Sequence, residues 1–571
     1  MWVVKRLLAP LMAAVLLTIV ATPAVSGAGT SARWTAWLAT NGTATLSVGT
    51  SGSGTLVLRL TGLTPRASYP VALERGTCTM PGTKRISLPA VKASSAGAVT
   101  RTFGLTAAQA TSARTSTKSG LLVRIGPLCG LFIVPLPQLA LRPGEAYFSI
   151  GGRQQVVFAR NLTSYWQTDF NIILGLTKAG GGRMVRVQLD SLGGGMTSAG
   201  VVDETWARNW EQVIDRAAAN GIYVIPVFSG WFDWNDGPGY STWTSNPLNK
   251  ANGGPAPTPA ELFTSGSTTQ AMWLSWVKAL VRRWQARTNI VAWEIFSEVN
   301  LASGVSEQTG VSFVERAASV IRGADPRSRP VTASLADLNE WPTLLRSPAV
   351  DFIEIHPYPA SGRLDTTIIA DVRQKLADYG KPVFIGESGL SADPPDGTTL
   401  STAGRARVGI KHAIWAGLVS GAMDGRALYW EDSFAIYFPD LGMSFVRSYA
   451  NAELAASRFA STVDVAGFRP LAVQVSADII GAAVGNERAA IGWFRDAGCE
   501  PPDWPLRQVV SNQSVAITPA GSALRWRVDF YSTATGTDLI GSVAATRQGD
   551  SITFALPAFT DDIAFKMYAQ P

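Results

Sequence analysis

Eight short apolar segments alternate with longer, helix-like segments between about residues 145 and 465. Brief β-branched runs separated by amphipathic stretches are typical of parallel α/β architecture, in which each strand is buried on both faces. Eight such units predict a (β/α)8 TIM barrel with loop insertions, which we assign to residues 138–465. The predicted strands are Gln155–Ala159, Met184–Leu189, Tyr223–Phe228, Ile290–Phe296, Pro330–Ser334, Phe352–His356, Val383–Gly386 and Ala427–Trp430.

Two of the intervening segments carry clear helix stop signals. The segment 204–220 ends at Asn220-Gly221, and the segment 366–379 is followed by Gly380. Glycine and asparagine accept the left-handed backbone that closes many helices. We therefore expect amphipathic helices over both segments. The longest insertion, residues 230–264, is rich in Trp, Asn, Pro and Gly and has no helical or strand period.

Short alternating strands and turns flank the predicted barrel on both sides. Residues 30–137 include the alternating runs Thr43–Val48 and Leu56–Leu60, separated by a Gly-Ser-Gly turn. This spacing predicts a β-sandwich, with an accessory role as a carbohydrate-binding module or a spacer. Residues 466–571 show the same kind of pattern and predict a second β-sandwich. The predicted fold class is therefore α/β, a TIM barrel flanked by an N-terminal and a C-terminal β-sandwich domain.

The first 28 residues read as a secretory signal peptide. Lys5 and Arg6 precede the apolar run Leu7–Ala21, and small residues suited to signal peptidase follow at Ala24–Ala28. The alternative is an uncleaved membrane anchor, which needs a longer apolar span. No later stretch is long and apolar enough to span a bilayer. We therefore expect a mature protein without a membrane span that is secreted, either extracellular or associated with the cell surface.

Cysteine and histidine content limits the chemistry that is available. Of three cysteines, Cys78 and Cys129 lie in one β-rich region, and a disulfide between them would contribute on the order of 4 kcal/mol by loop closure. Cys499 is left over. With only two histidines and no Cys/His cluster, we expect no metal site and no cofactor. The net charge of +7 is scattered, so no nucleic acid partner is expected, and a monomer is the simplest assembly.

Two glutamates follow predicted barrel strands. Glu298 comes just after Ile290–Phe296, and Glu387 comes just after Val383–Gly386. Because the carboxyl ends of barrel strands meet at one face, both carboxylates are expected there. Glu298 could instead be a helix cap. Strict alternation along the first strand places Glu294 on one face and Ser297 on the other.

An ordered set of motifs in this region resembles the clan A glycoside hydrolases, most closely family 5, the cellulase and mannanase group. The motifs are Trp293–Glu298, Phe352–Tyr358, Phe384–Gly389 and Leu428–Trp430. The resemblance covers the whole predicted barrel. It implies that Glu298 is the general acid/base and that Glu387 is the nucleophile.

The same resemblance implies supporting roles for four further residues. Arg186 would keep the nucleophile ionised, and a buried arginine requires a carboxylate nearby in any case. His356 would contact the substrate or the acid/base, and Tyr358 would donate to the nucleophile. Trp430 would form an apolar floor for a sugar ring. The alternative for His356 and Trp430 is a structural role, and His412, in a helical segment, is expected to be structural.

One position departs from the family pattern. The family has Asn immediately before the acid/base, where its amide binds the sugar 2-hydroxyl, and here the residue is Ser297. A serine reaches less far, so the departure implies an altered substrate, a lower activity or an inactive protein. Trp231, Trp234 and Trp243 lie in the long insertion and are expected to form cleft walls.

The function predicted from these features is a secreted retaining β-glycoside hydrolase that cleaves a polysaccharide or oligosaccharide by double displacement. Such an enzyme needs one protonated and one ionised carboxyl, about 5–5.5 Å apart. The alternative is a non-catalytic carbohydrate-binding surface protein that retains the barrel. A metal-dependent or phosphate-dependent barrel enzyme is disfavoured by the scarcity of ligands and of glycine-rich phosphate loops.

Overall fold

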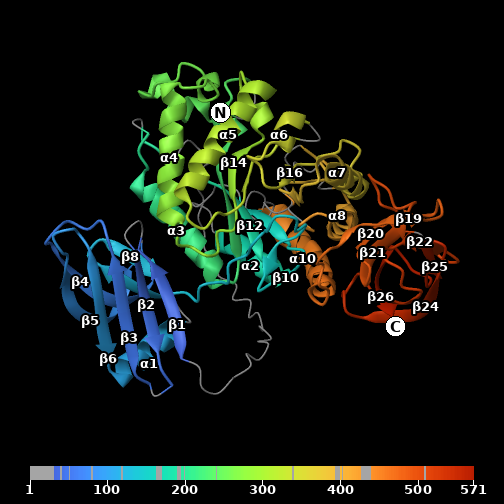
Figure 1. The fold of residues 1–571 in the computed structure, drawn as a ribbon, viewed down its shortest axis with the longest axis horizontal. Coiled ribbons are helices and arrows are strands. Elements are labelled where there is room, and N and C mark those ends of the chain that lie inside the picture. The colour runs from blue at the N-terminus through green and yellow to red at the C-terminus, as the bar shows by residue number, and fades with distance from the viewer. Residues whose placement is uncertain are drawn as a thin grey trace.

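The chain has three regions in space (Figure 1), an N-terminal β-region, a central α/β region and a C-terminal β-region, with the central region between the other two. The computed structural model describes residues 31–38, 42–50, 52–76, 78, 81–117, 120–162, 170–189, 195–197, 200–238, 241–336, 340–392, 399–400, 403–425, 428, 439–506 and 509–571. The predicted signal peptide therefore lies outside the described residues, as does most of the eighth predicted strand.

The central region is built on parallel strands that follow one another in chain order. Five of them form one sheet: β11 (Ala159–Leu162), β12 (Met184–Gln188), β13 (Tyr223–Gly230), β14 (Trp293–Ser297) and β15 (Val331–Thr332). Two more pair with each other: β16 (Ile353–Ile355) and β17 (Val383–Ile385). Isolated parallel bridges join Ser334 to Glu354, Ser388 to Leu428 and Val157 to Asp424. These bridges carry the pairing from β15 round to the start of the region.

The first parallel strand begins later than predicted. The apolar run suggests Gln155–Ala159, but the ladder with β12 covers Ala159–Leu162. Within this ladder, Arg160 and Asn161 are both buried. Arg160 pairs with Glu453, and Asn161 accepts from Arg186 at 3.3 Å. Because these partners come from remote parts of the chain, a local apolar pattern does not identify the strand.

Helices surround these strands (Figure 1). Their bounds are α2 (Phe170–Ala179), α3 (Glu204–Ala219), α4 (Thr268–Trp284), α5 (Glu307–Ala324), α6 (Pro342–Arg346), α7 (Leu364–Tyr379), α8 (Ala406–Ser420) and α10 (Pro439–Ser461). The Asp203 side chain caps α3 by accepting from the backbone N–H of Trp206 at 2.8 Å. Gly380 ends α7 in the left-handed conformation. Among the described residues, no helix is both long and apolar enough to cross a bilayer.

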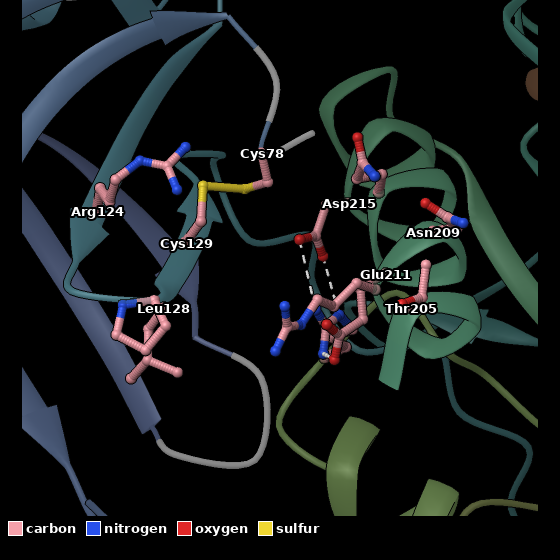
Figure 2. Close-up of a pocket in the computed structure, with 12 residues that line it drawn as sticks. Cys78, Arg124, Leu128, Cys129, Thr205, Asn209, Glu211 and Asp215 are labelled. Carbon is pink, nitrogen blue, oxygen red and sulfur yellow. Dashed lines mark hydrogen bonds and ion pairs between the residues drawn. A yellow bond between two sulfur atoms is a disulfide. The ribbon is translucent and has the colours of Figure 1, made fainter. Parts of the chain in front are cut away.

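The N-terminal region contains two antiparallel sheets around one apolar core. The first sheet has the order β1 (Ala32–Trp37), β2 (Gly42–Val48), β3 (Gly54–Leu60), β6 (Val99–Leu105). The second has the order β5 (Pro81–Lys92), β4 (Ser68–Gly76), β7 (Leu121–Ile125), β8 (Leu128–Leu131), and α1 (Ala107–Thr117) follows β6 in the chain. The predicted disulfide between Cys78 and Cys129 is confirmed. It faces α3 across a cavity of about 280 Å³, where Asp215 pairs with Arg287 at 2.8 Å (Figure 2).

A short hairpin of β9 (Ser149–Ile150) and β10 (Arg153–Gln154) leads into the central region.

The C-terminal region is one nearly closed antiparallel sheet of nine strands. Their order is β18 (Arg469–Pro470), β20 (Ile479–Gly485), β21 (Ala489–Asp496), β26 (Asp562–Gln570), β23 (Arg525–Tyr531), β24 (Leu539–Gln548), β25 (Ser551–Ala555), β22 (Ser514–Thr518), β19 (Ala472–Gln474). This form differs from the two separate sheets of the predicted sandwich. The long β24 accounts for the difference, since its first part pairs with β23 and its last two residues pair with β25.

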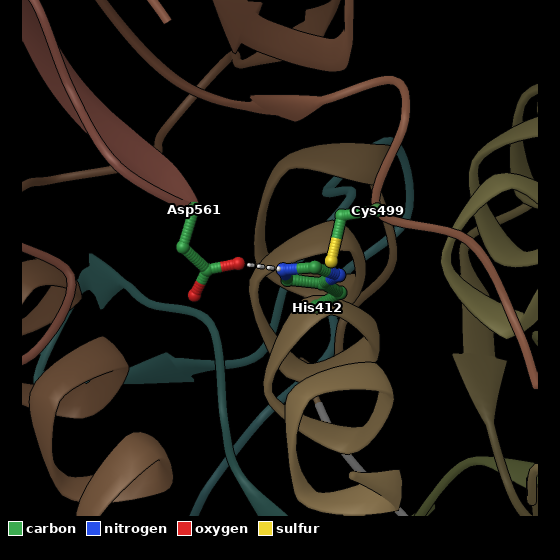
Figure 3. Close-up of side chains that lie close together, drawn as sticks. All are labelled: His412, Cys499 and Asp561. Atoms are coloured by element: carbon green, nitrogen blue, oxygen red, sulfur yellow. Dashed lines mark hydrogen bonds and ion pairs between the residues drawn. The ribbon is translucent and has the colours of Figure 1, made fainter. Parts of the chain in front are cut away.

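Helix α8 ties the central region to the C-terminal sheet. His412 Nε2 lies 2.7 Å from Asp561 Oδ1, and Lys411 Nζ lies 2.8 Å from Asp561 Oδ2. Lys411 also contacts Asp562 at 2.5 Å. The buried Cys499 lies beside the His412 ring (Figure 3). His412 therefore joins two parts of the fold, as expected for a structural histidine.

Candidate active site

Arg186, on β12, is the centre of a buried cluster of polar side chains. Its guanidinium is fully buried. Nε and Nη2 each donate to Glu294 at 2.7 Å, and Nη1 donates to Glu387 at 2.7 Å. Nη2 also donates to Ser297 at 2.9 Å, and Nη1 donates to Asn161 at 3.3 Å. These five contacts occupy all five N–H groups of the guanidinium.

Glu387 follows β17 and accepts three side-chain hydrogen bonds. The donors are Arg186 Nη1 at 2.7 Å, Gln188 Nε2 at 3.1 Å and Tyr358 Oη at 2.9 Å. Glu387 is itself buried, with 5% of its surface exposed. An ionised carboxylate accepts hydrogen bonds and donates none, so this environment favours the charged form.

Glu298 follows β14 at a sharp change of chain direction. Its backbone is left-handed, with φ 58°, which is uncommon for a residue with a side chain. The Glu298 N–H donates to Ser334 Oγ at 3.0 Å, and Glu298 Oε1 lies 2.9 Å from His356 Nδ1. One oxygen of Glu298 and one of Glu387 lie within 4.8 Å of each other, with His356 beside both. The two predicted glutamates therefore share one site.

The two glutamates differ in protonation. Burial raises the pKa of Glu298, the nearby Glu387 charge raises it further, and a hydrogen bond to His356 opposes both effects. Burial alone would also raise the pKa of Glu387. The charges of His356 and Arg186 and the hydrogen bond from Tyr358 outweigh burial and lower that pKa. Neighbouring carboxyls with opposite shifts suit one proton donor and one ionised group.

His356, at the end of β16, is fully buried between carboxyl groups. Burial opposes its charge, but the Glu387 charge, the hydrogen bond to Glu298 and the nearby Glu354 carboxyl raise its pKa to about 10. His356 is therefore a cation near neutral pH and adds to the positive charge that Arg186 supplies.

Ser297 faces the same guanidinium as Glu294, although strict alternation places the two residues on opposite faces. The alternation fails at the end of β14, where the chain leaves the sheet through the left-handed Glu298. Ser297 is 1% exposed, and its Oγ accepts from Arg186. Its hydroxyl is thus engaged in holding Arg186.

The predicted tryptophans lie in three different settings. Trp234, in the 3-10 turn η2 (Trp231–Trp234), is 2% exposed and packs against Trp243, with 5.6 Å between ring centroids. Contrary to the prediction, this burial makes Trp234 and Trp243 packing residues, because neither ring offers a free face to a sugar. Trp231 is half-buried. Trp430 lies outside the described residues. The other turns of the insertion are η3 (Trp243–Ser245), η4 (Lys250–Asn252) and η5 (Pro259–Leu262).

Four contacting residues were not among the predicted site residues. Glu294, Glu354, Gln188 and Asn161 all lie in the cluster around Arg186. A signal existed for the two glutamates, because each is a charged residue inside an otherwise apolar strand. Such a residue needs a buried partner.

Three groups of side chains in the described part of the chain have the composition of metal ligands. They are Glu298, His356 and Glu387; Glu294, Glu354 and His356; and His412, Cys499 and Asp561. In each group, one carboxylate is already in contact with an arginine or lysine from outside the group. Arg186 lies 2.7 Å from Glu387 and 2.8 Å from Glu354, and Lys411 lies 2.8 Å from Asp561. Bringing a metal ion so close to these cations would be unfavourable.

Comparison with known proteins agrees with this geometry. A family model for cellulase (glycosyl hydrolase family 5) matches residues 154–416. This segment is a glycosyl hydrolase family 5 domain. The family 5 domain contains Arg186, Glu298, His356 and Glu387, and the protein is a glycosidase. A comparison with curated sequences found no match.

Solved structures of glycoside hydrolases are similar to the chain in fold. One, described as a glycoside hydrolase, has 13% sequence identity and a TM-score of 0.52, covering 76% of this chain and 97% of its own. A family 5 glycoside hydrolase from Bacteroides vulgatus ATCC 8482 has 14% identity and a TM-score of 0.51, covering 76% and 93%. At these identities the likeness concerns the fold alone.

Proposed function

We propose that the protein is a retaining β-glycoside hydrolase in which Glu298 is the general acid/base and Glu387 is the nucleophile. The observation that carries this proposal is the pairing of two buried carboxyls, with oxygens within 4.8 Å and with pKa values shifted in opposite directions. A separation of this size suits attack by a carboxylate on the anomeric carbon. An inverting enzyme needs a wider gap that admits a water molecule.

The reaction proceeds by two displacements. In the first, a Glu387 oxygen bonds to the anomeric carbon while Glu298 gives its proton to the departing glycosidic oxygen. In the second, Glu298 takes a proton from water, whose oxygen attacks the anomeric carbon and releases Glu387. Glu298 is protonated again at the end, so the cycle closes without any other reactant.

The neighbours of the two glutamates support these roles. Arg186, Gln188 and Tyr358 all donate to Glu387, which keeps it ionised and limits its orientation. His356 Nδ1 lies 2.9 Å from Glu298 Oε1 and 3.9 Å from Glu387 Oε2. It therefore contacts the acid/base and helps to balance the negative charge of the site.

The substrate we propose is a polysaccharide or an oligosaccharide. Because Ser297 is buried and bonded to Arg186, a contact with the sugar 2-hydroxyl has to come from another group in this protein. Trp231 and Trp430 remain the aromatic candidates for sugar binding.

The setting of the enzyme completes the proposal. We propose that the chain is secreted, on the strength of its first 28 residues, and acts as a monomer. We also propose that the central region is a complete eight-stranded barrel. Two four-stranded sheets that share a core support an N-terminal β-sandwich with an accessory role.

A screen of β-mannans, β-glucans and aryl β-glycosides, with product analysis beside Glu387→Ala, tests the proposal. Hydrolysis by the wild type and none by the variant is the expected result. Saccharide binding without turnover by the wild type would instead favour a non-catalytic carbohydrate-binding protein.

A further inference from the structure

A second pair of glutamates lies beside the proposed catalytic pair, on two strands that have β15 between them. Glu294 is on β14 and Glu354 is on β16, and they are 0% and 2% exposed. An oxygen of each lies within 4.8 Å of an oxygen of the other. The proposed reaction assigns neither residue a task. We call Glu294 and Glu354 the inner pair.

The two members of the inner pair have unequal hydrogen bonding. Glu294 accepts two hydrogen bonds from Arg186 and one from Ser334 at 3.1 Å. Glu354 Oε1 lies 2.8 Å from Arg186 Nε, but the single hydrogen of Nε already points at Glu294. Within the part of the chain that the structure describes, neither oxygen of Glu354 has a hydrogen-bond partner, and neither does His356 Nε2, which lies 3.9 Å from Glu354 Oε1. A buried carboxylate without a donor is costly in the ionised form.

The Glu354 carboxyl cannot move to find a hydrogen-bond donor. A Cβ placed on Gly386 would lie 1.9 Å from Glu354 Oε1, so the carboxyl rests directly against the backbone that leads into Glu387. Glycine is the one residue that leaves room for it. Glu354 is thus held between Arg186, His356 and the strand that bears the nucleophile.

The charges around the inner pair do not balance if every carboxyl is ionised. Among the described residues, the titratable and charged groups of this cluster are Arg186 on β12, Glu294 and Glu298 on and after β14, Glu354 and His356 on and after β16, and Glu387 after β17. The neutral polar residues beside them in the described part of the chain are Asn161, Gln188, Ser297, Ser334 and Tyr358. Two cations therefore face four carboxyl groups. With a proton on Glu298, three carboxylates remain for two positive charges in a buried site.

We infer that Glu294 and Glu354 together hold one proton at neutral pH and so act as a positioning pair that leaves a full share of the Arg186 charge to Glu387. With this proton the cluster is neutral overall. The strong coupling of close carboxyls makes the proton a property of the pair and not of one residue. Consistent with this, burial and the Glu354 charge raise the pKa of Glu294 to about 8, against the opposing charge of Arg186. The inference rests on the proposed function for the proton on Glu298 and deepens it.

Counting protons released on unfolding tests the inference without any assay of activity. Wild type and Glu354→Gln are unfolded in unbuffered guanidinium chloride at pH 6.5 and back-titrated. Unfolded glutamates are ionised at this pH. Wild type should release one proton more per molecule than the variant, because in the variant Glu294 alone faces Arg186 and stays ionised. Equal release would overturn the inference.

A control and a second variant keep the test decisive. Glu340 pairs with Lys375 and Tyr379 away from the cluster, and its hydrogen bond to Lys375 lowers its pKa. Glu340→Gln should therefore release as many protons as wild type. If Glu354→Gln does not fold, Glu294→Gln removes the other member and should show the same deficit of one proton.

Where activity is measurable, the dependence of kcat/KM on pH tests the inference independently. In Glu294→Gln/Glu354→Gln, Glu387 is the carboxylate partner of Arg186 that remains among the described residues, so the pKa of Glu387 should fall. The acid limb of kcat/KM should then move to lower pH, and a limb that stays or moves up counts against the inference. An inactive wild type would defeat the proposed function, while the proton count would still decide the inner pair.

Discussion

Two buried clusters in this protein each place a histidine against a carboxylate, yet their charges differ. Around Arg186, four carboxyl groups of the described residues face Arg186 and His356. At the junction of α8 with the C-terminal sheet, Lys411 and His412 face Asp561 and Asp562 (Figure 3). The first cluster has twice as many carboxyl groups as basic side chains, whereas the second has equal numbers of the two.

The difference shows up in the pKa values. In the first cluster the excess pushes the pKa of Glu298 up and leaves that of Glu387 low. In the second, burial is outweighed by a hydrogen bond to His412 and by the charge of Lys411, which lower the pKa of Asp561. An excess of buried carboxyl groups over basic side chains thus produces an acid and a base in one site. Equal numbers of the two hold two parts of the fold together.

The largest effect that separates the two clusters is expected for Glu387→Gln. An amide cannot form the glycosyl ester, so kcat should fall on the order of 10⁴-fold or more. Glu340→Gln is the matched control and should keep wild-type activity. Near-normal turnover by Glu387→Gln would remove the nucleophile from the account.

Glu298→Gln should cost about 10²–10⁴-fold with a poor leaving group, because the proton donor is lost. Since the pKa of Glu298 is raised, the wild type should lose activity as pH rises through that pKa, and this alkaline limb should vanish in the variant. The measurement is kcat/KM against pH. An aryl glycoside that leaves without a proton should show a much smaller loss in its first step, and an equal loss would argue against acid catalysis.

Asp561→Asn should act on stability alone. It removes charge-assisted hydrogen bonds to Lys411 and His412, at a cost of about 2 kcal/mol in the free energy of unfolding. Because the pKa of Asp561 is lowered on folding, its contribution is present above the ordinary value of 3.8 and is lost as pH falls. The stability gap between wild type and variant should therefore close in acid. Denaturant unfolding measures the gap, and a large loss of kcat with unchanged stability would contradict the comparison.

The smallest effect is expected for Tyr358→Phe. The variant loses one hydrogen bond to Glu387, worth about 1.5 kcal/mol, or roughly tenfold in kcat/KM. Because that bond lowers the pKa of Glu387, the acid limb of the pH profile should move to higher pH. An unmoved limb would mean that Tyr358 does not help to keep Glu387 ionised.

Several strands and helix ends, and the meeting of Glu298 and Glu387 in one site, could be predicted from the sequence. The apolar, β-branched cores of β12, β13 and β17 identify these strands, and the rule that barrel strands end at one face brings Glu298 and Glu387 together. Helix ends at Asn220 and Gly380 were readable because stop signals are local.

The features of the fold and the site that could not be predicted depend on contacts between distant segments. The β11 strand contains Arg160 and Asn161, whose partners lie elsewhere in the chain. Burial of Trp234 depends on a partner nine residues away in an aperiodic insertion. The local sequence marks Glu294 and Glu354 as charged residues inside apolar strands, but it does not show that their buried partners bring them together. Only the folded arrangement shows that all five Arg186 donors are taken.

The anomeric configuration of the first product tests the central assignment most directly. Nuclear magnetic resonance during hydrolysis of the best β-glycoside found in the screen would follow the new reducing end before it mutarotates. Two displacements through Glu387 predict that the β configuration appears first. An initial α product would contradict a covalent intermediate and, with it, the assigned roles of Glu298 and Glu387.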